Sequence, residues 1–273
     1  MRYAITSIQR DRAPWILEWI AFHMVVGFNR FYIYSHRCTD GMTDLLVRLG
    51  RHHPIFVHPI EVPLRPQLVA YQHAWNAYGG DVDWMAFIDG DEFLFPTQAE
   101  TVGEALIPFE HEPLSALASF WMCYGSSGHL EEPEGLVWDN YTRHAEIGFL
   151  PNRHVKSIVR GRQGPLLVTG SHVFKTPQGT FDEQLRPVDH GWMKSLDPSY
   201  GALRINHYAV QSHDFFRQTK QTMGAADGNP ALVRPDTWFH EYDRNECDDG
   251  VRYRFLLRLR LKLRELRASL AED

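Results

Sequence analysis

The stretch that decides the fold is residues 84–96, WMAFIDGDEFLFP. Its first five residues form a short, continuous apolar run, which is typical of a central strand buried on both faces of a parallel sheet. The run ends in the acidic cluster Asp89-Gly90-Asp91-Glu92, and apolar residues resume at Phe93. Because ligands of an open α/β sheet bind beyond the carboxyl ends of its strands, we expect this cluster at the ligand-binding edge.

The acidic cluster places three carboxylates within four residues, so their mutual repulsion requires a compensating cation, hydrogen-bond donors or water. A hard cation such as Mg²⁺ or Mn²⁺ needs only one or two carboxylates when phosphates and water complete its shell. The pair Asp89 and Asp91 meets this requirement. Taken alone, the cluster is explained equally well by a turn that caps the next element. The apolar residues on both sides favour the metal site.

The rest of the chain alternates strand and helix patterns over its first hundred residues, as expected for a parallel sheet with crossover helices. Further strands are expected at Tyr3–Ile8, Arg30–Tyr34, Ile55–Pro59, Ser115–Trp121, Val155–Val159, Leu166–Val168 and Leu203–Tyr208. Helices are expected at Pro14–Val26, Leu68–Tyr78, Ser212–Met223 and Val251–Leu270. The pattern predicts an α/β fold in which residues 1–273 form a single domain.

The composition and the missing motifs argue against several classes of protein. A formal charge of −6 argues against nucleic-acid binding, and three cysteines without a CxxC pair indicate neither a disulfide framework nor a zinc site. We see no signal-peptide pattern and no apolar run of the roughly 20 residues that span a bilayer, so we expect a cytoplasmic protein. The GxxxxGK[ST], GxSxG and HExxH motifs are absent, and no GxGxxG follows the first strand.

Several other motifs accompany DGDEFLFP in a fixed order along the chain. They are Trp15–His23, Gly27-Phe28, Phe31–Tyr34, Thr39–Thr43, Trp121–His129, Pro133–Val137, Lys156–Val159 and Ile205–Tyr208. In this ordered set the chain resembles bacterial glycosyltransferase family 2-like proteins and their relatives in family 92. The resemblance implies a GT-A fold, a mostly parallel sheet flanked by helices, with a nucleotide-sugar donor, a divalent metal and inversion at the anomeric carbon.

The function implied is a metal-dependent glycosyltransferase that moves a sugar from a nucleoside-diphosphate sugar to a glycan, lipid-linked or other hydroxyl acceptor. A UDP-sugar is favoured and a GDP-sugar is the alternative. Residues 1–96 would bind the donor, 97–250 would carry the acceptor and catalytic side, and 251–273 would form a basic C-terminal helix. Arg10-Asp11 and Ser35-His36 stand where the family often has Asn-Glu and Asp-Asn, so the base and the sugar are not predicted.

The resemblance also suggests roles for the metal site. Asp91 is expected to bind the metal directly and to be essential for catalysis, whereas Asp89 contacts the ribose or reaches the ion through water. His207, at the end of Ile-Asn-His-Tyr, is the expected third ligand, with His172 as the alternative. Either histidine is equally explained as an ordinary strand residue hydrogen-bonded to a neighbour.

Donor, acceptor and base are assigned by chemical type and position. Thr6 and Asp40 are expected to line the nucleotide pocket, with turn formation as the alternative, which Asp40-Gly41 would satisfy fully. Lys156 is expected to neutralise the leaving diphosphate, and a solvated lysine on an edge strand is the equal alternative. Asp139 has the chemical type of the base that inversion requires, with a surface aspartate as the alternative. An aromatic platform for the acceptor would be formed by Trp121, Tyr124 and His129, and core packing explains Trp121 equally well.

The segment 252–267, RYRFLLRLRLKLRELR, carries seven basic residues against one Glu. Its leucine-rich composition favours a helix, which either lies on an anionic membrane on the cytoplasmic face or docks by its leucines with a solvated basic face. Rival functions are a nucleotidyltransferase, a glycoside hydrolase, and a sugar- or nucleotide-sugar-binding protein of the same fold without turnover.

Overall fold

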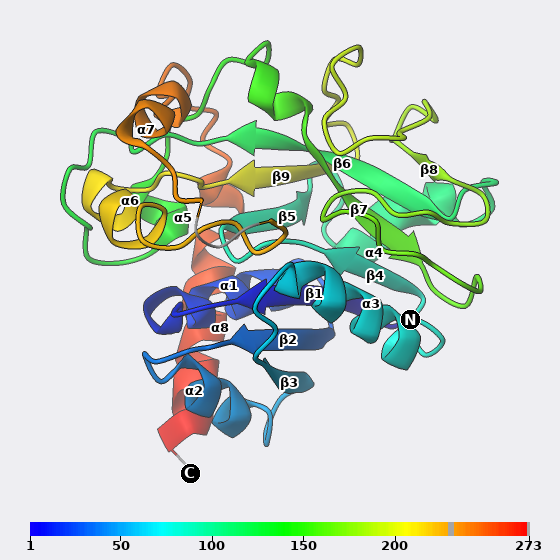
Figure 1. Ribbon diagram of the computed structural model, residues 1–273, viewed down its shortest axis with the longest axis horizontal. Coiled ribbons are helices and arrows are strands. Elements are labelled where there is room, and N and C mark those ends of the chain that lie inside the picture. The colour runs from blue at the N-terminus through cyan, green and yellow to red at the C-terminus, as the bar shows by residue number, and fades with distance from the viewer. Residues whose placement is uncertain (229–231, 272–273) are drawn as a thin grey trace.

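Strand β4, Trp84–Phe87, lies inside a nine-stranded sheet in the computed structural model, which describes residues 1–228 and 232–271 (Figure 1). The strand order is β3-β2-β1-β4-β7-β6-β9-β5, and β8 pairs with β6. The first four strands are parallel, with β1 at Tyr3–Gln9, β2 at Arg30–His36 and β3 at Ile55–Ile60. The predicted α/β class, a mostly parallel sheet flanked by helices, is confirmed.

The second half of the sheet contains the antiparallel pairs. Its strands are β5 at Glu92–Pro96, β6 at Ala116–Cys123, β7 at Val155–Arg160, β8 at Thr180–Phe181 and β9 at Leu203–His207. Strand β7 is antiparallel to β4 and β6, β9 is parallel to β6, and β5 is antiparallel to β9. The chain therefore leaves β4 and enters the far edge of the sheet at β5. Residues 88–91 make this connection, so the acidic cluster links two separate parts of the sheet.

Helices cover both faces of the parallel half. Ile5 packs with α1, Ala13–Val25, and α2, Met42–Leu49, whereas its neighbour Ala4 packs with α3, Pro66–Tyr78. Successive strand side chains point to opposite faces, so one strand supplies both cores. Shorter helical elements are α4 at Val102–Leu106, η1 at Ile107–Phe109, α5 at Val137–Asn140, η2 at Leu150–Arg153, α6 at His213–Thr219 and α7 at Asp236–Tyr242.

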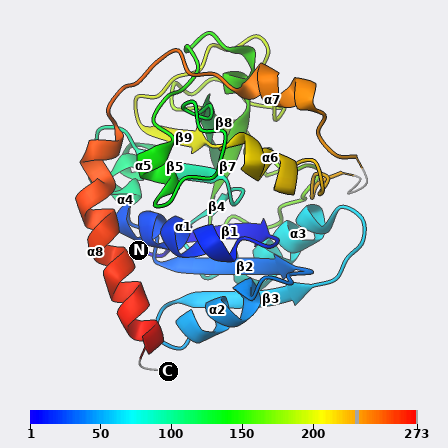
Figure 2. The same ribbon diagram turned by 90° about the vertical axis from the view of Figure 1, so that its left-hand side faces the viewer.

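The last helix, α8 at Arg252–Ala271, runs along one side of the molecule against α1, with α3 and α6 on the other side (Figure 2). It buries Phe255, Leu259, Leu263 and Leu266, and Arg254 donates to the carbonyl groups of residues 96, 97 and 99. This is the docked arrangement, and membrane contact stays a prediction. Among the described residues, no helix has both the length and the apolar character that crossing a bilayer requires.

Two expected elements were wrong in detail. Residues 166–168 do not form a strand: Leu167 is half exposed and makes only an isolated bridge with Lys175. The helix expected to reach Met223 ends at Thr219. Beyond that point the Thr222 hydroxyl donates to the carbonyl groups of residues 218 and 219, and such local side-chain bonds compete with helical hydrogen bonding.

Candidate functional site

The acidic cluster is held by backbone contacts from three directions. Arg12 donates to the Gly90 carbonyl group at 3.0 Å, and the Tyr208 amide donates to the Asp91 carbonyl group at 2.9 Å. Pairing of β5 with β9 places Glu92 opposite His207. The turn therefore has a fixed shape, and both aspartates project toward one cavity, which they help to line.

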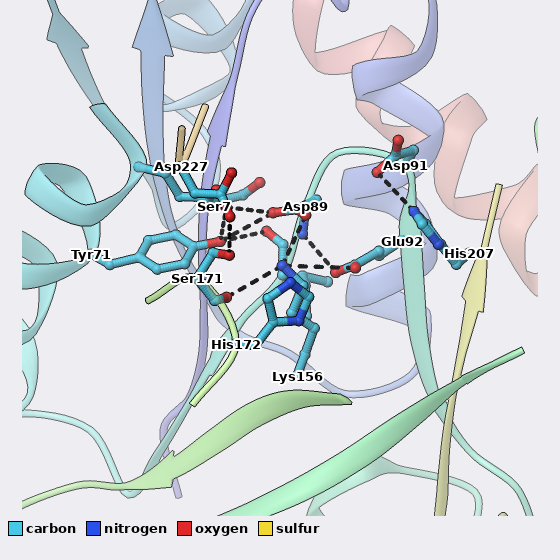
Figure 3. Close-up of polar contacts among 12 residues, drawn as sticks. Ser7, Tyr71, Asp89, Asp91, Glu92, Lys156, Ser171, His172, His207 and Asp227 are labelled. Carbon is cyan, nitrogen blue, oxygen red and sulfur yellow. Dashed lines mark hydrogen bonds and ion pairs between the residues drawn. The ribbon is translucent and has the colours of Figure 1, made fainter. Parts of the chain in front are cut away.

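Asp89 has no free carboxylate oxygen (Figure 3). Its Oδ1 accepts from Gln67 Nε2 at 2.5 Å and from the Tyr71 hydroxyl at 3.3 Å, and its Oδ2 accepts from Lys156 Nζ at 2.8 Å. Burial acts to raise the pKa of Asp89, but the Lys156 charge outweighs it, and the pKa lies below its ordinary value. Asp89 is thus an ionised carboxylate.

Lys156 is fully buried on β7, and its ammonium group also donates to the Ser171 carbonyl group at 3.3 Å. Burial acts to lower the pKa of Lys156, yet the charges of Asp89 and Glu92 raise it above its ordinary value. The Glu92 carboxylate lies 3.8 Å from Nζ, and burial raises the pKa of Glu92 well above its ordinary value. Lys156 and Asp89 therefore form the closer ion pair, and Glu92 lies beside them as the second acidic partner of Lys156.

Asp91 lies on the other side of the turn, and its side chain is more buried than that of Asp89. Its Oδ2 accepts from Lys220 Nζ at 2.5 Å, and its Oδ1 lies 3.9 Å from His207 Nε2. Burial works to raise the pKa of Asp91, but Lys220 together with His207 and Arg12 lowers it below its ordinary value. Burial lowers the pKa of His207 to about 4, so its imidazole is neutral at physiological pH. The buried His207 Nδ1 has no hydrogen-bond partner among the residues that the structure describes.

A cavity of about 400 Å³ opens beside Asp91, between the ends of β1 and β2 and the segment from α6 to α7. Arg10, Arg12, Lys220 and Arg234 all line it. His172 lines it too, and its Nδ1 lies 2.7 Å from the Val155 carbonyl group, a contact that fixes the proton on Nδ1. The unprotonated Nε2 of His172 is therefore an acceptor. Cationic side chains around a cavity of this size suit an anionic ligand such as a diphosphate.

The structure brings five of the expected site residues to this region. Asp89, Asp91, His207 and Trp121 line the cavity, and Lys156 lies directly behind Asp89. Trp121 is only 7% exposed, and its ring contacts those of His207 and His154 at centroid distances of 3.9 and 4.6 Å. Little ring surface is therefore left for a sugar to stack on.

Two residues expected at the nucleotide pocket lie elsewhere. Thr6 is fully buried within β1 and does not line the cavity. The strand continues beyond Thr6 to Gln9, and its last residues, Ile8 and Gln9, line the cavity instead. Asp40 is exposed, and its carboxylate accepts from the amides of Ala13 and Met42, where α1 and α2 begin. Asp40 therefore makes the turn contacts that its Asp-Gly sequence offered as the alternative.

The expected base and two acceptor residues also lie outside the cavity lining. Asp139, on α5, pairs with Arg260 of α8 at 2.6 Å. The Tyr124 hydroxyl is buried and accepts from Arg204, and the His129 ring contacts the Asn140 carbonyl group at 3.3 Å. We assign no catalytic role to Asp139.

Several site residues were missed from the sequence. Gln67 and Tyr71 lie on α3, and their spacing of four residues puts both on the helix face toward Asp89. Arg12 and Lys220 reach the acidic cluster from α1's start and α6's end. The four-residue spacing of Gln67 and Tyr71 could have been recognised in the sequence, whereas no sequence pattern indicates that Lys220 reaches the acidic cluster.

Comparison with known proteins gives the family. The sequence profile of glycosyltransferase family 92 matches residues 3–196. The chain belongs to glycosyltransferase family 92. A family 92 protein of rice, Oryza sativa subsp. japonica, is 25% identical over 254 residues, covering 86% of this chain and 41% of the relative. A family 92 protein of Arabidopsis thaliana is 26% identical over 264 residues, covering 84% of this chain and 42% of the relative.

This family 92 chain thus spans about two fifths of the length of these curated relatives. They are plant proteins, whereas the sequence had suggested bacterial ones; the family 92 part of the resemblance is confirmed. Among solved structures, that of S. aureus TarS 1–349 is similar with a TM-score of 0.39 and 14% identity, covering 59% of this chain and 47% of that one.

Proposed function

We propose that this family 92 chain transfers a sugar from a nucleoside-diphosphate sugar to a hydroxyl acceptor, using a divalent cation held by Asp91 and His207. The observation that carries the proposal is the pair itself. Asp91 Oδ1 and His207 Nε2 face each other at 3.9 Å beside the cavity, and the imidazole is neutral. An ionised carboxylate and a neutral imidazole are the protonation states that metal ligation requires.

The donor set fits Mn²⁺ better than Mg²⁺, because Mg²⁺ prefers an all-oxygen shell and an imidazole nitrogen does not. A cation held at Asp91 would stabilise the negative charge that develops on the departing nucleoside diphosphate. Asp89 already uses both of its oxygens, so it acts on the cation through its charge and through water. Lys156 fixes Asp89 in place from behind and does not line the cavity.

The residues of the cavity support an anionic donor. Arg10, Arg12 and Arg234 lie on its wall, and a guanidinium group can bind phosphate oxygens in a bidentate manner. The neutral His172, whose pKa burial lowers to about 3, presents an acceptor nitrogen that can orient a sugar hydroxyl. Inversion, a UDP-sugar before a GDP-sugar, a glycan or lipid-linked acceptor and a cytoplasmic site of action are further parts of this proposal, and they rest on the sequence resemblance.

The test is a thermal-shift screen of UDP- and GDP-sugars with and without Mn²⁺. A donor at a hundredfold excess over its Kd should raise the melting temperature by about 5 °C when Mn²⁺ is present. The shift should vanish in Asp91→Ala and persist in Asp189→Ala, a control that removes an exposed aspartate outside the cavity. Retention of the full shift in Asp91→Ala would show that the metal site is assigned to the wrong residue.

Donors that bind are then tested for turnover. Release of the nucleoside diphosphate, dependent on both Mn²⁺ and an added acceptor, supports transfer, and the anomeric configuration of the product decides between inversion and retention. Hydrolysis of a simple glycoside in the presence of EDTA would instead support a hydrolase. Donor binding without any turnover across acceptors would support a binding protein.

A further inference from the structure

The main chain of Lys220 is fixed by hydrogen bonds, whereas its side chain is free to change conformation. It follows α6, where its amide donates to the Phe216 carbonyl group and its own carbonyl group accepts from the Arg234 amide, both at 2.9 Å. Phe216 is fully buried with Phe239 in a small apolar cluster. The backbone position of Lys220 is therefore fixed, while four rotatable bonds separate it from the ammonium group.

The ammonium group of Lys220 is at present the strongest partner of Asp91. Nζ lies 2.5 Å from Oδ2, whereas His207 Nε2 stays 3.9 Å from Oδ1. The Lys220 side chain is 29% exposed and that of Asp91 is 8% exposed, and both residues line the cavity. Lys220 can therefore leave Asp91 without carrying its charge through the apolar interior.

Lys156 provides the contrast within the same site. Its side chain is 0% exposed, and its Nζ contacts Asp89 at 2.8 Å, Ser171 at 3.3 Å and Glu92 at 3.8 Å. Moving that ammonium group would remove the cationic partner of Asp89 and of the fully buried Glu92, which is costly. The two lysines thus differ: the counter-ion of Asp89 is permanent, and that of Asp91 is exchangeable.

We propose that Lys220 is an exchangeable counter-ion, which neutralises Asp91 in the empty site, leaves it when a divalent cation binds there, and then binds the diphosphate of the donor. The inference rests on the proposed function, because it takes Asp91 as a metal ligand. A cation bound between Asp91 Oδ1 and His207 Nε2 lies close to the ammonium group on Oδ2 and repels it, and an ammonium group displaced into the cavity meets the region where the diphosphate of the proposed donor would lie. Lys220 would thus make metal and nucleotide bind cooperatively.

The consequence is a measurable coupling. A cation that arrives alone displaces Lys220 at the cost of its ion pair with Asp91, so metal binding is weak. With the nucleotide present, Lys220 exchanges one anion for another, and metal binding strengthens. Linkage requires that the metal strengthen nucleotide binding by the same factor.

The experiment measures Mn²⁺ binding from the electron paramagnetic resonance signal of free Mn²⁺, with and without UDP. Lys220→Met, which keeps the length of the side chain and removes its charge, should bind Mn²⁺ alone about tenfold more tightly than the wild type. The factor by which UDP strengthens Mn²⁺ binding should fall about tenfold in the same variant. The control Lys262→Met removes an exposed lysine paired with Glu265 on α8 and should match the wild type.

The outcomes separate this inference from the proposed function. Equal or weaker binding of Mn²⁺ alone in Lys220→Met, with Asp91-dependent binding intact in the wild type, overturns the counter-ion role and leaves the metal site standing. An undiminished effect of UDP in that variant overturns it as well. If Asp91→Asn changes Mn²⁺ binding neither in the wild type nor in Lys220→Met, both the metal site and the counter-ion role are wrong.

Discussion

Replacing Lys156 by methionine should cost about 3 kcal/mol of unfolding free energy. Breaking a buried ion pair by removing one partner typically costs about 3–5 kcal/mol, because a charge is left uncompensated. Lys156 is 0% exposed, which places it fully in this class, but Asp89 is 33% exposed and keeps its hydrogen bonds from Gln67 and Tyr71. These contacts put the cost at the lower end of the range. Methionine retains the apolar contacts of the lysine stem, so the loss reports the charge.

Urea unfolding at pH 7.5 provides the assay, arranged as a double-mutant cycle with Asp89→Asn. In Asp89→Asn the Lys156 charge can still pair with Glu92, 3.8 Å away, so that variant should lose less than Lys156→Met. The double variant should recover about 2 kcal/mol relative to the sum of the single losses, as expected for residues in direct contact. A loss in Lys156→Met within about 0.5 kcal/mol of the surface control Lys262→Met would refute the reasoning, as would strictly additive losses.

Two further results are expected. His23 is buried, its Nδ1 contacts the Trp19 carbonyl group at 2.7 Å and its Nε2 accepts from the Leu94 amide at 3.2 Å; burial lowers its pKa to about 3. The stability it contributes is present above the ordinary histidine pKa of about 6.5 and is lost as the pH falls below it. His23→Gln should therefore reduce the loss of unfolding free energy between pH 7.5 and pH 5 by about 2 kcal/mol. Urea titrations at the two pH values measure this, and an unchanged loss would contradict it. Asp139→Asn should leave donor binding and turnover within about twofold of the wild type, because Asp139 pairs with Arg260 outside the cavity; a hundredfold loss of turnover with normal donor binding would restore Asp139 as the base.

The central strand and the acidic cluster could be predicted because their signals are local. An apolar run of five residues followed by three acids needs no tertiary context to be recognised. The meeting of Asp91 with His207 was expected only through the family resemblance, and the pairing of β5 with β9 accounts for it physically. The sequence alone does not give the order of the strands in the sheet, so it could not show that Asp91 and His207 meet.

Contacts between distant segments could not be predicted. Lys220 reaches Asp91 across 129 positions, and a lysine at the end of a short helix looks like any solvated lysine. Thr6 was misplaced because a strand pattern shows which residues are buried but not where the binding edge lies relative to each one. Asp139 had the right chemical type, and only the position of α8 showed that Arg260 holds it outside the cavity.

The packing of α8 on α1 also sets an order of events during synthesis. Phe22 of α1 contacts Phe255 of α8. More than two hundred residues separate the two in the sequence, so α1 leaves the ribosome long before the helix that covers it. Until then, the apolar side of α1 faces water and is available to molecular chaperones. The strands and helices of residues 1–96 can begin to fold early, but the core that Phe255 joins is completed only when α8 emerges.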